Sequence, residues 1–373
     1  MAKHFWQGIA TITGVSIGAG ILALPYAINK VGFLLGAIEI IIIGIAMLML
    51  NLFLGEVILR TKGNHQLYNL AGKYLGYNGK RLMFIAFVLG IYGAIAAYLI
   101  GEGELISLLL NIPYASAGVI FFCFLAIITY FGVNILEKSE MTMNAIKILL
   151  FLSIFYFVAN DSFSYANLAR VSYSNILLPL GTLLFSFMCF FILPEIKEEL
   201  KGNYKDLKKV IIIASIITII VYILFTFLVI GATGDSTSEV ATIALSIGFN
   251  SRVMVLINLF AVVTILTAAV ALSFALKQMF IEDFKIKNVT AWLLTLLPPV
   301  VISVMLKSFS TIIALTGAIT GGLTGAMVMM MYQNAKKYGD RKPEYFIRNN
   351  IIIEVLLLII FVAALFIEIL SII

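Results

Sequence analysis

Long apolar runs recur along the chain, and they constrain its fold more than any other feature. A helix needs about 20 consecutive apolar residues to cross the hydrocarbon core of a bilayer. Because such a helix satisfies its own backbone hydrogen bonds, a chain built of these runs is expected to be an all-α integral membrane protein. We count eleven runs, at residues 6–29, 32–59, 81–110, 114–136, 141–159, 174–194, 207–232, 251–279, 289–307, 309–333 and 347–372.

The composition leaves no room for a second domain. Of the 373 residues, 62% are hydrophobic and 12% charged, with a mean hydropathy of +1.09. The loops between the runs are short, so we expect residues 1–373 to form a single transmembrane domain that is not an enzyme. His4 and His65 belong to no metal-ligand or nucleophile cluster, so no metal and no cofactor are expected. Cys123 and Cys189 lie in apolar runs and predict no extracellular disulfides.

Lysines and arginines indicate the orientation in the membrane. If odd-numbered spans run outward, 20 of the 25 basic residues fall in the cytoplasm, and the rest are Lys30, Lys147, Arg170, Arg252 and Lys307. This predicts a multi-pass protein of the plasma (inner) membrane with a cytoplasmic amino terminus and an extracellular carboxyl terminus. The net charge of +6 is then the cytoplasmic bias of a protein in a lipid bilayer, and no nucleic acid is needed to explain it.

The first span contains residues that break a helix. Gly14, Gly18, Gly20 and Pro25 all fall within it. Glycine costs roughly 1 kcal/mol relative to alanine inside a helix, and proline about 3. A discontinuous helix at mid-membrane is a feature of transporter binding sites. The alternative is that Gly14 and Gly18 only form a close-packing face between helices.

The sixth span repeats this pattern. Residues 174–194 contain Pro179, Gly181 and Pro194 within an apolar stretch. Five spans separate the two starts, so residues 6–159 and 174–333 are predicted to be inverted repeats that each open with a broken helix, with residues 347–372 as an extra helix. Between spans, residues 64–79 are expected to form an amphipathic helix and residues 235–249 a loop with a short helix.

Two breaks of this kind suit a zwitterion. The outer half of the first span, which begins near Gly18, offers free amides and the positive end of a helix dipole to a carboxylate. The freed carbonyls of residues 14–16 and of the sixth span offer acceptors to an ammonium group or a cation. The pattern therefore favours an amino acid as the small-molecule substrate.

Several segments also resemble a known family. Residues 14–26 (GVSIGAGILALPY) are similar to the first-helix signature of the amino acid/auxin permeases and the related hydroxy- and aromatic-amino-acid permeases, within the amino acid–polyamine–organocation superfamily. Residues 185–190 with 194–200, and residues 96–103, resemble the sixth and third helices of these proteins. The resemblance implies the leucine-transporter fold, of five plus five inverted helices with helices 1 and 6 broken, and secondary active amino acid transport by alternating access.

The resemblance also implies which residues bind the substrate. It places the carboxyl group on the first break, its amine and side chain on the sixth span, an aromatic gate at one of two phenylalanines, and a tyrosine hydroxyl near the carboxyl group. For each aromatic the alternative is ordinary packing. The residues so implied are Ser16, Ile17, Gly18, Ala19 and Gly20; Phe185, Ser186, Phe187 and Met188; Phe187 or Phe190 as the gate; and Tyr98.

Lys147 is the first candidate for ion coupling. It lies within the fifth span, where an ionisable residue is a functional candidate. In some proton-coupled members of the superfamily, a similarly placed lysine reaches between helices 1 and 8 and takes the place of sodium. Burial can lower the pKa of such an ammonium group by several units. The alternative is that Lys147 extends to the cytoplasmic interface.

A sodium site is the competing interpretation. Thr264 and Thr267 are three residues apart, on one face of the eighth span. Sodium-coupled relatives often have two adjacent hydroxyl residues here, but position 268 is alanine. Such threonines also often bond their own backbone.

Glu102 and Glu104 in the third span are further candidates. Being two residues apart, they cannot both lie on one helix face. One could accept the coupling proton or pair with a substrate amine, and the alternative is that both are solvated at the outer end of the helix. Relatives usually lack an acid at position 102.

The sequence therefore predicts a symporter of neutral amino acids, with hydrophobic or aromatic ones as first candidates, coupled to protons. The alternatives are a sodium-coupled symporter and an amino-acid-sensing receptor subunit with the same fold.

Overall fold

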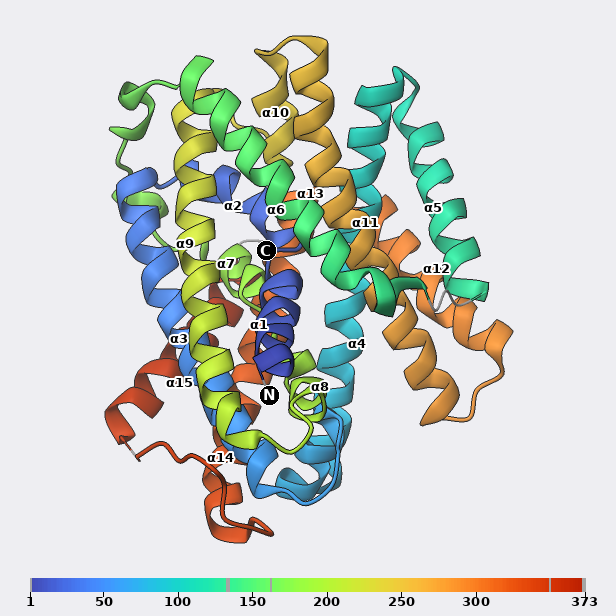
Figure 1. The fold of residues 1–373 in the computed structure, drawn as a ribbon, viewed down its shortest axis with the longest axis vertical. Helices are drawn as coiled ribbons and strands as arrows, with labels where there is room; N and C mark the ends of the chain where they lie inside the picture. Colours follow the sequence, from blue (N-terminus) through green and yellow to red (C-terminus); the bar gives the residue numbers. More distant parts are fainter. Residues whose placement is uncertain (1, 132–134, 162, 349, 371–373) are drawn as a thin grey trace.

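The chain folds into long helices that run mostly along one axis (Figure 1). The computed structural model describes residues 2–131, 135–161, 163–348 and 350–370, and no strand occurs within these ranges. The helices are α1 (Ala2–Ser16), α2 (Gly20–Asn29), α3 (Phe33–Arg60), α4 (Leu67–Leu110), α5 (Tyr114–Phe131), α6 (Ile135–Asp161), α7 (Leu180–Ser186), α8 (Leu193–Glu199), α9 (Leu207–Thr233), α10 (Ala241–Ile247), α11 (Ser251–Glu282), α12 (Asn288–Leu306), α13 (Phe309–Thr316), α14 (Gly322–Tyr338) and α15 (Ile351–Leu370). Short 3-10 turns lie at Tyr165–Leu168, Tyr173–Asn175, Phe190–Ile192, Tyr204–Asp206 and Gly234–Ser236, and a π-helical turn (η6) at Gly317–Gly321.

The predicted all-helical membrane class is confirmed. Among the described residues, nine helical segments are long and apolar enough to cross a bilayer, and ten if the bent pair α1–α2 counts as one span. The remaining predicted run lies in α6, whose apolar part, Met143–Ala159, is shorter. The expected helix at 64–79 is also present, but it is continuous with the third span in α4 through a kink at Gly76, where φ is 74°.

Contacts divide most of the helices into two groups. In one group α4, α5, α11 and α12 pack on one another. In the other, α9 packs on α1, α2 and α3, and α7 packs on α2 and α3. The segment α13–η6–α14 lies between them, against α4 on one side and α7 and α3 on the other, while α6 packs on α11, α1 and α9.

The π-helical turn packs very closely on its neighbours. A Cβ atom added at Gly317 would lie 2.0 Å from the Gly181 carbonyl oxygen of α7. A Cβ atom added at Gly93 of α4 would lie 1.9 Å from Thr316 Oγ1. Glycine at position 317 therefore lets the π-helical turn approach the α7 backbone, and glycine at position 93 leaves room for the Thr316 side chain.

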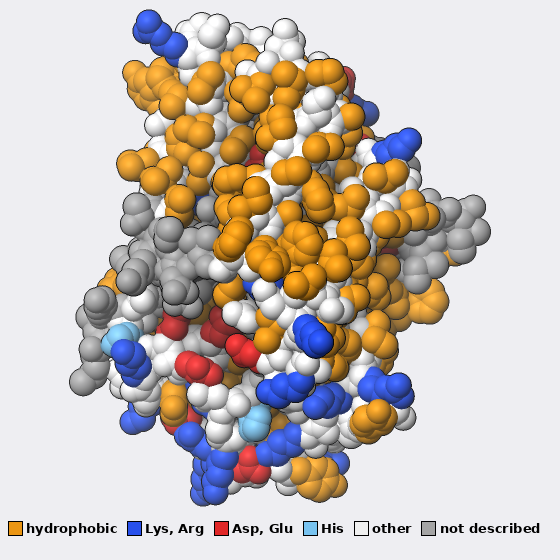
Figure 2. Space-filling model, turned by 90° about the vertical axis from the view of Figure 1, so that its right-hand side faces the viewer, with side chains coloured by type: hydrophobic (Ala, Val, Ile, Leu, Met, Phe, Trp, Pro, Cys, Tyr) orange, Lys and Arg blue, Asp and Glu red, His pale blue; other side chains and the backbone are white. Residues whose placement is uncertain are grey.

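The surface has the distribution expected of a membrane protein. Hydrophobic side chains cover a broad zone of the face in Figure 2, and lysines and arginines gather at its lower end. Exposed apolar side chains include Leu34 and Ile42 on α3, Val119 on α5, Val304 on α12 and Ile359 on α15. Since lipid rather than water contacts such a zone, its exposure has no solvation cost.

Candidate functional site

The first span breaks between α1 and α2. The two helices meet at an angle of 51°, with Ile17–Ala19 between them. A Cβ atom added at Gly20 would lie 2.7 Å from Ser186 Cα, so only glycine allows α2 to approach the end of α7 so closely. Gly18 faces α11, with its virtual Cβ atom 4.0 Å from Ala268 Cβ. The predicted break is therefore present, and it faces both the sixth span and the eighth.

The sixth span is also interrupted, and its break lies next to that of the first span. Helix α7 ends at Ser186, Phe187–Cys189 are not helical, and α8 begins at Leu193 with Pro194 in its first turn. Proline lacks a backbone N–H, so it suits a helix start and not a helix interior. Since Gly20 touches Ser186, the two breaks lie against each other.

Tyr222 of α9 joins the two breaks. Its side chain is completely buried. Its hydroxyl lies 2.6 Å from the carbonyl oxygen of Ser186 and also within hydrogen-bond distance of the carbonyl oxygen of Ser16. These are the last residues of α7 and α1, where carbonyls lose their helical partners. One hydroxyl therefore lies where the negative ends of two half-helices converge.

Other polar and aromatic groups surround this point. Asn51 of α3 donates to Cys189 Sγ at 3.2 Å, and its Oδ1 is buried without a hydrogen bond. The Phe187 ring packs on Tyr222 at a centroid distance of 4.8 Å. Tyr98 of α4 is 4% exposed and close enough to Tyr222 to interact electrostatically. Of the predicted substrate residues, those of both breaks and Tyr98 thus lie in one region.

The remaining predicted substrate residues have separate environments. Phe190 is fully buried and packs on the Phe191 ring at 4.4 Å, which is the packing alternative. Phe185 and Met188 are largely buried beside the break, and the Ser186 hydroxyl donates to the Thr182 carbonyl of its own helix at 2.8 Å.

Lys147 is buried in α6, with 7% of its surface exposed. One turn earlier, Asn144 donates to the Ala10 carbonyl at 3.4 Å and lies against Gly14 of α1. Residues three apart share a helix face. Lys147 is therefore on the face of α6 that turns toward α1 close to its break, and it does not extend to an exposed interface.

The two threonines of α11 differ in their hydrogen bonding. Thr267 donates to the Val263 carbonyl of its own helix at 2.8 Å, as in the backbone-bonding alternative. Thr264 is completely buried, and its hydroxyl has no hydrogen-bond partner. Ala268, with no hydroxyl, is the α11 residue that faces Gly18.

Glu102 is 1% exposed, and neither of its carboxyl oxygens has a hydrogen-bond partner. The solvated alternative is therefore wrong for this residue. Its carboxyl group lies close to the backbone of Leu266 in α11, whereas Glu104 is only half-buried. Glu102 is four positions after Tyr98, so both lie on one face of α4.

One side of the site is covered by the segment that follows α9. The predicted loop 235–249 contains the short helix α10, which packs on α2, α9 and α11. Glu239 accepts hydrogen bonds from the Ser310 amide at 3.0 Å and from the Ser308 hydroxyl. Asn29, at the end of α2, donates to the Gly234 carbonyl at 2.8 Å. This loop therefore connects the start of α13 with the end of α2.

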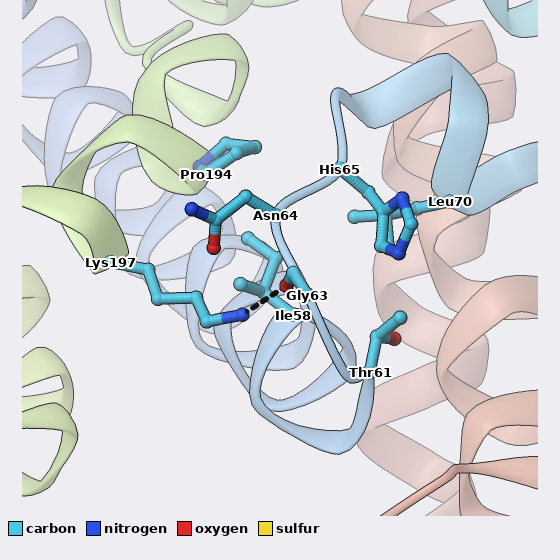
Figure 3. A pocket seen from close by; sticks show the side chains of 8 residues that line it. All are labelled: Ile58, Thr61, Gly63, Asn64, His65, Leu70, Pro194 and Lys197. Carbon is cyan, nitrogen blue, oxygen red and sulfur yellow. Dashed lines mark hydrogen bonds between the residues drawn. The ribbon is translucent and has the colours of Figure 1, made fainter. Parts of the chain in front are cut away.

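The opposite side is covered as well. Figure 3 shows Lys197 of α8 reaching the loop between α3 and α4, where it donates to the Gly63 carbonyl at 2.6 Å beside Asn64 and His65. Near the end of α3, Glu56 accepts hydrogen bonds from Arg60 and from the Ile347 amide.

The segment after α14 is held to the same end of the molecule. Asp340 accepts hydrogen bonds from Lys73 and from the Lys62 amide. The hydrogen bond from Lys73 holds the pKa of the exposed Asp340 carboxyl below its usual value, so we expect this contact to survive until the pH falls through that lowered pKa.

Comparison with known proteins assigns the family. The sequence profile of the tryptophan/tyrosine permeases matches residues 1–368. The chain belongs to the tryptophan/tyrosine permease family. The family consists of membrane permeases, which transport amino acids and are not enzymes.

Two characterised proteins are similar to this permease. Glutamine transporter 2 of Aliivibrio fischeri is 23% identical over 305 residues, which cover 77% of the chain and 78% of that protein. Tyrosine-specific transport system 1 of Haemophilus influenzae is 24% identical over 318 residues, which cover 78% of each.

A solved structure confirms the predicted leucine-transporter fold. The permease superposes on MhsT in complex with L-phenylalanine with a TM-score of 0.67, over 98% of both chains and at 14% identity. Among the described residues, no group of three or more histidine, cysteine or acidic side chains is placed to hold a metal ion.

Sequence reasoning missed three residues of the permease site: Tyr222, Asn51 and Cys189. For two of them a signal was available. Asn51 follows Leu48, Met49 and Leu50, and Tyr222 follows Ile219, Ile220 and Val221. A hydrogen-bonding side chain at mid-span usually has a partner inside the protein. Cys189 carries no such signal, because cysteine is commonly buried as a small apolar residue.

Proposed function

We propose that this permease is a proton-coupled symporter of neutral amino acids that works by alternating access. The observation that carries the proposal is the meeting of the two breaks, with Gly20 against Ser186 and the carbonyls of Ser16 and Ser186 on one point. A positive helix end and two negative ones then lie within reach of one small zwitterion.

The substrate carboxylate is assigned to the start of α2. Residues Ile17–Gly20 precede or open this helix, and Ala19 at its N-cap supplies no side-chain hydrogen bond. The Ile17 amide donates to the Thr13 carbonyl, so the carboxylate is assigned to the amides of Gly18, Ala19 and Gly20. The ammonium group is assigned to the carbonyls at the ends of α1 and α7.

The substrate side chain is assigned to an apolar surface. Phe185, Phe187, Met188 and Tyr98 lie around the breaks, with Phe190 behind them. Such a surface suits a hydrophobic or aromatic amino acid. This choice agrees with the tyrosine named for one relative and the phenylalanine bound to MhsT, while the glutamine named for the other makes a polar neutral side chain the first alternative.

The coupling proton is assigned to Lys147. It is buried on the face of α6 toward α1, and Ala268 stands where a second hydroxyl would favour sodium. A buried ammonium group is expensive unless it is partnered or deprotonated, so its protonation responds to how the neighbouring helices move. A sodium site at Thr264 and Thr267 is the competing assignment.

Movement is assigned to the two helix groups. We propose that α1, α2, α3 and α7–α9 rock against α4, α5, α11 and α12, and that residues 6–159 and 174–333 are the inverted repeats behind this motion. The basic end in Figure 2 is taken as cytoplasmic, which places the amino terminus inside and the carboxyl terminus outside the cell membrane.

Uptake of radiolabelled amino acids into proteoliposomes tests the proposal. Sodium and pH gradients are imposed separately on a panel of aromatic, aliphatic and amide amino acids. We expect accumulation driven by the pH gradient alone. Accumulation driven only by sodium would replace the proton assignment with the threonine site. Binding without uptake under any gradient would mean that the chain is a sensor.

A further inference from the structure

Tyr222 lies where the substrate ammonium group is expected. Its hydroxyl is within hydrogen-bond distance of the carbonyls of Ser16 and Ser186, and the ring is held by Phe187 at 4.8 Å. An ammonium group assigned to the same two carbonyls competes with this hydroxyl for them. We therefore expect hydroxyl and ammonium group to alternate.

The empty protein has a physical need for such a donor. A buried carbonyl without a partner costs about 1–3 kcal/mol. When the substrate is bound, its ammonium group supplies several N–H donors to the carbonyl ends. Without substrate, and with both sides covered, no ammonium group donates to these carbonyls. They would then lack a hydrogen-bond donor if residue 222 had no hydroxyl.

We propose that Tyr222 is a positioning residue that stands in for the substrate amine, and so allows the substrate-free protein to close and return. This rests on the proposed symport function, because a symporter performs net transport and must return empty in every cycle. Tyr222 belongs to α9, the helix that packs on α1, α2 and α3, so its hydrogen bonds also hold the two breaks together.

The proposal separates two activities that share one binding site. Exchange moves a bound amino acid in each direction and never needs the empty closed state. Net uptake needs it once in every cycle. Loss of the Tyr222 hydroxyl should therefore slow net uptake and spare exchange, whereas loss of an ordinary structural contact should lower both.

The test compares Tyr222→Phe with wild type and with Tyr92→Phe in proteoliposomes. Tyr92 is a matched control, because its hydroxyl also donates to a carbonyl, that of Leu294 at 2.7 Å, but between α4 and α12. We expect net uptake by Tyr222→Phe to fall about tenfold while exchange stays within about twofold, and the Tyr92→Phe ratio to match wild type. An equal fall in both activities, or no fall in either, overturns the proposal.

A second variant covers the case in which Tyr222→Phe does not fold. Placing 3-fluorotyrosine at position 222 keeps the ring and makes its hydroxyl a stronger donor. At about pH 6, where phenols are protonated, we expect the ratio of net uptake to exchange to rise. An unchanged or lower ratio contradicts the proposal. If wild type neither accumulates nor exchanges any amino acid, the proposed function itself fails.

Discussion

Lys147 is the residue on which the coupling assignment depends. Lys147→Met keeps the length of the side chain and removes its charge. We expect accumulation driven by a pH gradient to be abolished, because no proton is then carried past the break, while exchange of amino acid continues. Proteoliposome uptake with and without the gradient measures both.

The control for this variant is Lys205→Met, which removes an exposed lysine from the turn before α9. Its uptake should match wild type. If Lys147→Met still accumulates substrate in proportion to the imposed pH gradient, the coupling proton travels by another group.

Glu102 is a second buried ionisable side chain among the predicted coupling residues. An ionised carboxylate without a partner is expensive in such a place, so we expect the neutral acid in this closed state. Glu102→Gln should then change the free energy of unfolding by no more than about 0.5 kcal/mol. If Glu102 must be protonated again in each transport cycle, uptake by the wild type declines at alkaline pH. This decline should then be smaller in Glu102→Gln.

Thermal unfolding and uptake across a pH series check both statements. Glu104→Gln, at the half-buried neighbour, should leave the pH profile unchanged. If Glu102→Gln is strongly destabilised, the ionised carboxylate of Glu102 stabilises the fold. Glu102 is then not the group that carries a proton.

At the scale of elements, the sequence predicts the helix breaks and not what fills them. Gly18, Gly20 and Pro194 act through backbone conformation, which local sequence reveals. Tyr222 acts through a partner more than thirty residues away along the chain, and no local pattern reveals such a contact. The π-helical turn at Gly317–Gly321 was likewise missed, since glycine in an apolar run also fits an ordinary packed helix.

The close approach of α2 and α7 gives a prediction for these elements. A Cβ atom added at Gly20 would meet Ser186 Cα at 2.7 Å and its Oγ at 2.7 Å, so Gly20→Ala must push the breaks apart. We expect the free energy of unfolding to fall by about 1–3 kcal/mol, and substrate binding to be lost.

Gly118→Ala in α5 is the matched control, because nothing lies within 4 Å of its virtual Cβ atom. It should be neutral or slightly stabilising, since alanine is the better helix former. Thermal unfolding and calorimetric binding of phenylalanine compare the two. Full binding by Gly20→Ala would show that the breaks do not form the site.

At the scale of the whole molecule, polar contacts add to the apolar packing of α8 and α10 that covers the two sides of the breaks. Glu239 holds the loop 235–249 to α13, and Lys197 holds α8 to the loop after α3. Contacts of this kind can be made and broken at low cost, because water replaces the lost hydrogen bonds when a side opens. This is the arrangement expected of a protein that opens on alternate sides.

Cys189 provides a native reporter for opening toward the Lys197 side. It lies in the second break and is 3% exposed, whereas Cys123 is exposed on α5 and must first be replaced, as in Cys123→Ala. In that background, Lys197→Met removes the hydrogen bond to the Gly63 carbonyl that holds α8 in place. We expect a water-soluble thiol reagent added from that side to modify Cys189 roughly tenfold faster, the effect of losing about 1.4 kcal/mol.

Lys201→Met, in the exposed turn after α8, should leave the rate unchanged, and added substrate should slow it in both proteins. An unchanged rate in Lys197→Met would mean that other contacts close this side, with the segment after α14 as the next to be tested.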